Sequence, residues 1–103
     1  MSFAHCTDED RKIIGECLQA TVDGPFFPEW EFETLFGLSR TEVAEISSVW
    51  PNLDKTNPRV DLAVNNALGN LAGYPHGQED IWEKFISVPP SRLIEVLELW
   101  RLR

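Results

Sequence analysis

The stretch FETLFGLSRTEVAEISSVW, residues 32–50, decides the fold. An apolar run ends at Gly37, and Ser39 is followed three residues later by Glu42. That spacing is typical of a capping box, in which each of the two side chains accepts a hydrogen bond from the other residue's backbone. Apolar residues then recur at helical spacing until Pro51, which cannot continue a helix. The stretch therefore predicts two short helices joined by a glycine turn, as in a helix-turn-helix.

Two further helices are expected upstream. Thr7 followed by DEDRK is typical of a helix start, and an apolar stripe indicates a helix over about residues 8–22. DGP at 23–25 ends it, and we expect Gly24 to be left-handed there. Pro28 fits the first position of a helix that runs to residue 36. The alternation of Trp30 and Phe32 also fits a short strand, but the apolar residues at 35 and 36 favour the helix.

Downstream, Asn57 and Pro58 form an N-cap and first-turn pair for a strongly amphipathic helix that ends at Gly73. The opposite face of this helix carries poor helix formers, which indicates that close packing or hydrogen bonding compensates there: Asn65, Asn66, Gly69 and Asn70. A short helix is expected within QEDIWEKFI, 78–86, and a last one ends in RLR, 101–103. The sequence thus predicts an all-α bundle of five to six short helices, one domain over 1–103, with 1–6 as its fraying end.

The charge balance narrows the choice of partner. Seventeen Asp and Glu against nine Lys and Arg give a formal net charge of −8, and no Lys or Arg occurs between Ile13 and Ser39. Such a chain repels nucleic acid and anionic membranes and attracts basic proteins. Polar residues interrupt every apolar run, no signal peptide is recognisable, and two cysteines are too few for a disulfide framework. We therefore expect a protein of the reducing cytoplasm.

The charges also weaken the DNA-binding interpretation of the opening motif. A DNA reader presents the N-terminal residues of its second helix to base edges, and flanking cations neutralise phosphates. Here Glu42 and Glu45 would face the groove, close to Glu29, Glu31 and Glu33 of the preceding helix. The negative charge of these carboxylates would repel the phosphate backbone of DNA.

No constellation predicts catalysis, a metal or a cofactor. His5 and Cys6 are adjacent, so they lack the spacing with which paired ligands share one zinc ion, and Cys17 lies on an apolar stripe. The chain has neither a nucleophile elbow nor a glycine-rich phosphate loop. His76 near Glu79 could act as an acid or base, but we expect an exposed histidine in a turn. The prediction is a binding protein and not an enzyme.

The candidate binding surface combines acids with aromatic anchors, the pattern of an interface in which a charged rim surrounds an apolar centre. The partner-binding candidates are Asp23, Phe26, Glu29, Trp30, Glu31, Glu33, Glu42 and Glu45, with Trp30 or Phe26 as the anchor. The alternative is that the acids form a solvated face and the aromatics belong to the core.

Three segments carry a family resemblance: DGPFFPEWEFETLFGLSRTEVAEI at 23–46, NNALGNLAGYPHG at 65–77 and LELWR at 97–101. With its acidic composition, the chain resembles small bacterial immunity proteins that protect cells from toxins of contact-dependent growth inhibition. The resemblance implies a basic, nuclease-type toxin as partner, which an acidic inhibitor would occlude. It assigns no individual residue.

Two other functions stay open at this point. A general helical interaction or regulatory module would be equally acidic but need not meet a basic nuclease, and a DNA-binding regulator would retain the helix-turn-helix. The resemblance and the charge together favour an inhibitor with a protein partner, without nucleic acid or membrane, as a monomer or weak dimer.

Overall fold

The computed structural model describes residues 6–53 and 56–102, and every regular element within these ranges is a helix. This confirms the predicted all-α bundle. The α-helices are α1 (Asp8–Asp23), α2 (Glu29–Phe36), α3 (Arg40–Val49), α4 (Pro58–Gly73) and α5 (Pro90–Arg101), and a 3₁₀ helix, η2 (Glu79–Lys84), lies between α4 and α5.

Three of the predicted helix starts, those of α1, α3 and α4, are confirmed, because their caps form. The Ser39 hydroxyl accepts from the Glu42 N–H and the Glu42 carboxylate accepts from the Ser39 N–H, which completes the capping box of α3. Thr7 and Asp10 make the same reciprocal pair at α1. Asn57 caps α4, with a proline in the first turn.

Two local predictions are wrong. Gly24 has φ −86° and is extended, so glycine is needed there for close approach: a Cβ would lie 2.7 Å from both the Ala20 carbonyl and the Phe26 ring. Pro28 precedes α2 as its N-cap instead of starting it. The short helix expected within 78–86 forms as the six-residue 3₁₀ helix η2.

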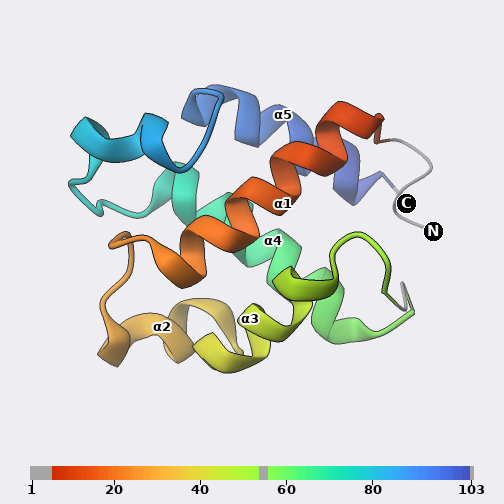
Figure 1. The fold of residues 1–103 in the computed structure, drawn as a ribbon, viewed down its shortest axis with the longest axis horizontal. Coiled ribbons are helices and arrows are strands. Elements are labelled where there is room, and N and C mark those ends of the chain that lie inside the picture. The colour runs from red at the N-terminus through yellow and green to blue at the C-terminus, as the bar shows by residue number, and fades with distance from the viewer. Residues whose placement is uncertain (1–5, 54–55, 103) are drawn as a thin grey trace.

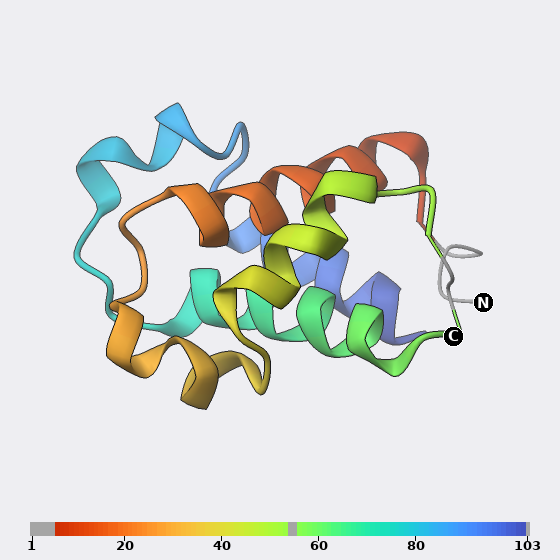
Figure 2. The same ribbon diagram turned by 60° about the horizontal axis from the view of Figure 1, so that its bottom comes forward.

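Helix α4 is the centre of the bundle, because α1, α2, α3 and α5 all pack against it. Figure 1 shows α1 crossing in front of α4, with α5 on one side and α2 and α3 on the other. Turned by 60°, the bundle still has α2 and η2 at the same end of its long axis (Figure 2). The Trp50–Pro51 peptide bond that follows α3 is cis.

The apolar stripes meet in one core cluster, in which Ile14, Cys17 and Leu18 of α1 are completely buried. Cys6, the last residue of the segment expected to fray, is also buried, whereas 1–5 lie outside the described residues. Within the described ranges, none of the helices has the length and apolar character needed to cross a membrane.

Candidate functional site: the acidic surface of α2 and α3

The α2–α3 pair has the predicted arrangement of two short helices joined by a glycine turn. Gly37 ends α2 with φ 70°, in the left-handed region that favours glycine, and its N–H donates to the Glu33 carbonyl at 2.8 Å. Two asparagines of α4 satisfy further carbonyls at this helix end: Asn66 Nδ2 donates to Phe36 O at 2.8 Å and Asn70 Nδ2 to Leu35 O at 3.0 Å. The poor helix formers on α4 thus hold α2 in place.

Arg40, the first residue of α3, is held by backbone and side-chain partners. Its Nη1 donates to the carbonyls of Thr21 and Val22 at 2.8 and 3.0 Å, and its Nη2 donates to Phe27 O at 3.0 Å. Its Nε donates to Glu29 Oε1 at 2.7 Å, and the guanidinium carbon lies 4.4 Å from the centre of the Phe32 ring. Arg40 therefore joins the end of α1, the 24–28 loop and α2.

The side chains that project farthest from this junction belong to α2. Trp30 is 80% exposed, more than any other large hydrophobic residue of the described chain. The side chain of Glu29 is 78% exposed even though it pairs with Arg40. Glu33, one turn after Glu29, is exposed and has no ion pair or side-chain hydrogen bond within 6–53 and 56–102. Asp23 is exposed at the end of α1, next to the carbonyls that Arg40 binds. We call Asp23, Glu29, Trp30 and Glu33 the α2 face.

Two of the other acidic candidates have structural partners. Glu31 accepts a hydrogen bond from the Tyr74 hydroxyl, and this bond, with burial and the negative charge of Glu31, raises the pKa of Tyr74 above its ordinary value. Glu42 belongs to the α3 capping box and lies 3.3 Å from Nη1 of Arg59 on α4. The Ser39 N–H, aided by the Ser39 hydroxyl and Arg59, lowers the pKa of Glu42 despite partial desolvation. Glu45 is exposed on α3, separate from these contacts.

The assignment of Phe26 as a surface anchor is wrong, because Phe26 is only 1% exposed. Its ring packs edge-on against His76, Trp82 and Phe85, with centroid separations of 5.0 to 5.7 Å. The loop after Gly24 turns this ring inward beneath η2, so the aromatic part of the surface reduces to Trp30.

His76 also differs from its prediction. Its side chain is only 5% exposed, its Nδ1 accepts from the Gln78 N–H at 3.0 Å, and its ring stacks near Trp82 with centroids 5.8 Å apart. The ring contacts that bury it come from residues 26 and 82, so its position could not be inferred from the turn alone.

The cysteines are placed as core residues. Burial raises the pKa of Cys17 far above its ordinary value, and burial together with the charge of Asp10 raises that of Cys6. Both thiols are therefore poor nucleophiles at neutral pH. Among the described residues, no group of three or more His, Cys, Asp or Glu side chains could hold a metal ion, and His5 lies outside them.

Comparison of the chain with protein-family models, curated proteins and solved structures found no significant match. The functional argument therefore depends on the geometry of the α2 face.

Proposed function

We propose that this chain is an inhibitor of the immunity type, which neutralises a basic, nuclease-type toxin in the bacterial cytoplasm by binding it through the α2 face. The observation that carries the proposal is the exposure of Trp30, 80%, on a helix whose neighbouring exposed side chains are acidic. Exposed tryptophan is costly in water, and interface energy concentrates in such side chains when a partner covers them.

The charge distribution supports a basic partner. Glu29 directly precedes the exposed Trp30 on α2, Glu33 follows it three residues later, and Asp23 is a third exposed carboxylate at the end of α1. Such a field steers a basic protein toward the surface and speeds association, while burial of the indole would slow dissociation.

The contacts of Arg40 argue against nucleic acid as the partner of the same surface. It is the only Lys or Arg between Ile13 and Asp54, and its donors already bind Glu29 and three backbone carbonyls. A phosphate would have to compete with these bonds while lying close to Glu29 and Glu33.

The test is co-expression with the product of the adjacent reading frame, read as growth of the cells. The intact chain should rescue growth, and Trp30→Ala should weaken binding of the purified toxin by about thirtyfold or more. Glu33→Lys should slow association and reduce its salt dependence. The matched control is Glu98→Lys on α5, which also reverses one exposed negative charge but leaves the α2 face intact.

If the intact chain fails to rescue growth, the inhibitor function is wrong. If Trp30→Ala and Glu33→Lys bind the toxin with wild-type affinity, the α2 face is not the binding surface. Binding to a non-toxic partner through Trp30 would favour the general interaction module instead. A gel shift with an operator-like duplex at physiological salt would contradict the charge argument and restore the DNA-binding regulator.

A further inference from the structure

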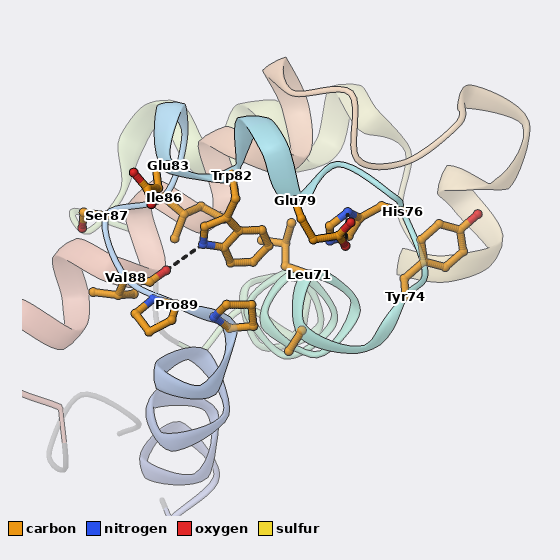
Figure 3. A pocket seen from close by; sticks show the side chains of 12 residues that line it. Leu71, Tyr74, His76, Glu79, Trp82, Glu83, Ile86, Ser87, Val88 and Pro89 are labelled. Atoms are coloured by element: carbon orange, nitrogen blue, oxygen red, sulfur yellow. Dashed lines mark hydrogen bonds and ion pairs between the residues drawn. The ribbon is translucent and has the colours of Figure 1, made fainter.

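A pocket lies at the same end of the molecule as α2 (Figure 2), between the end of α4, η2 and the start of α5 (Figure 3). It is a pocket of about 560 Å³. Small-molecule sites of proteins typically measure roughly 300 to 1,000 Å³ and are mostly apolar, with a few polar groups that orient the ligand. The pocket has the size and lining of such a site.

The inner wall is apolar and fixed before any ligand enters. Trp82 is 6% exposed, and its Nε1 donates to Val88 O at 2.7 Å, the dashed bond in Figure 3. Leu71 and Ile86, each 1% exposed, also line the wall. Because the indole N–H already has its acceptor, this wall offers a ligand apolar contact without an unsatisfied polar group.

The rim is acidic. Glu79 and Glu83, four residues apart on η2, both line the pocket and are exposed, and the side chain of Glu79 is 77% exposed. The lining residues include no Lys or Arg. Helix α4 ends at Gly73 beside the pocket, so its partial negative charge has the same sign as the carboxylates. An anion is disfavoured at this rim, and a cation is favoured.

We propose that this pocket binds a small amphipathic organic cation, an amine or guanidine that carries an apolar body. The body would lie against Trp82, Val88 and Pro89, and the cationic group would remain at the mouth, where Glu79 and Glu83 lie on opposite sides of Trp82 (Figure 3). Carboxylates and aromatic rings together stabilise such a group without stripping all of its water. This proposal is independent of the toxin partner, because none of the α2 face residues lines the pocket.

The probe is phenethylamine, compared with two compounds of similar shape, neutral 2-phenylethanol and anionic phenylacetate. Each is titrated into the ¹⁵N-labelled full chain, and the indole N–H signals are followed by NMR. The Trp82 signal should shift with the amine while that of Trp30 stays in place. The amine should bind about fivefold or more tightly than the alcohol, and phenylacetate should bind least.

Three variants locate the interaction. Glu79→Gln with Glu83→Gln should reduce the affinity for the amine to that for the alcohol, whereas Glu95→Gln with Glu98→Gln on α5 should leave the preference unchanged. Ala72→Met, which adds a flexible side chain to the pocket wall, should abolish binding with the amide spectrum preserved. Equal affinity for amine and alcohol, retained binding in Ala72→Met, or a preference that survives in Glu79→Gln with Glu83→Gln would overturn the proposal.

Discussion

Arg92 Nη2 on α5 donates to Asp10 Oδ1 on α1 at 2.6 Å, across 82 residues of sequence. Asp10 is 1% exposed, and its carboxylate also accepts from the Thr7 N–H while its own N–H donates to the Thr7 hydroxyl, so this residue serves a helix cap and an interhelical ion pair at once. A buried carboxylate is tolerated only with such partners. This contact fixes the first helix to the last.

Replacing Asp10 with Asn should therefore destabilise the fold by about 2 kcal/mol in urea unfolding, because Arg92, two-thirds buried, loses its shorter ion pair and keeps only the exposed Glu95 at 3.4 Å. This change in the free energy of unfolding is smaller than that expected for a fully buried ion pair, because water reaches the guanidinium. The control is Glu9→Gln in the same turn, which is exposed and should change the free energy of unfolding by less than about 0.5 kcal/mol. Equal effects of the two substitutions would show that the ion pair contributes no stability.

The carboxylate of Asp10 should also make the stability of the protein depend on pH in the acidic range. Burial alone would raise the pKa of Asp10, but the bonds from Thr7 and Arg92 outweigh it and lower the pKa below the ordinary value of 3.8. The unfolded state then binds the proton more readily, so the stabilisation is complete well above pH 3.8 and is lost as the pH falls through the lowered pKa. The free energy of unfolding of Asp10→Asn should fall less steeply than that of wild type between about pH 5 and pH 3. Parallel profiles would contradict the lowered pKa.

Arg40→Lys should cost about 1 to 2 kcal/mol, because one ammonium cannot reproduce the planar set of bonds to Glu29 and three carbonyls. The matched variant Arg59→Lys alters an exposed ion pair and should stay within about 0.5 kcal/mol. Thermal unfolding of both variants measures the difference. If Arg40→Lys were as stable as Arg59→Lys, the guanidinium geometry would be irrelevant to the fold.

Removing the asparagine side chains of α4 that bind α2 should lower the local stability of α2 more than the global stability of the protein. In Asn66→Ala with Asn70→Ala, the loss of two hydrogen bonds, about 1 kcal/mol each, is partly offset by the better helix propensity of alanine. Hydrogen exchange should accelerate in α2 while the α1 amides remain protected. Uniform acceleration across both helices would indicate that α2 does not open separately.

Replacing either of two helical glycines with alanine should change the stability of the protein, but in opposite directions. A Cβ on Gly69 would lie 3.9 Å from Leu97 Cδ2, an ordinary contact, so Gly69→Ala should stabilise the protein by about 1 kcal/mol. A Cβ on Gly15 would lie 2.9 Å from Trp50 Cδ1, and that indole is held by its bond to Arg11 O. Gly15→Ala should therefore lower the melting temperature. The same sign of change in both variants would contradict this packing.

The helices were predictable because their signals are local. Capping boxes such as Ser39 with Glu42, and the apolar stripes, depend on residues three or four apart. The role of Phe26 was not predictable in this way, because its burial depends on His76, Trp82 and Phe85, which lie at least 50 residues away in sequence.

The candidate site was predictable only in part for the same reason. An unusual run of acids on a short helix identified Trp30 and its neighbours, but Glu31 and Glu42 turned out to have partners on or just after α4. The local pattern assigns no structural role to Arg40, the first residue of α3. Its isolation among acids was the available signal that it serves as their internal counter-charge, since a lone cation there is drawn to nearby carboxylates and carbonyls.

Arg40 is the only Lys or Arg between Ile13 and Asp54, and its donors already bind Glu29 and three backbone carbonyls, so this segment has no cation left to screen the exposed Asp23, Glu33 and Glu45. Dissolved ions must supply that screening, and they do so over a Debye length of about 8 Å at physiological ionic strength. The behaviour of this side of the molecule is thus set by the surrounding electrolyte: dilution should extend the reach of its potential, and concentrated salt should reduce it to a contact of shape and apolar surface.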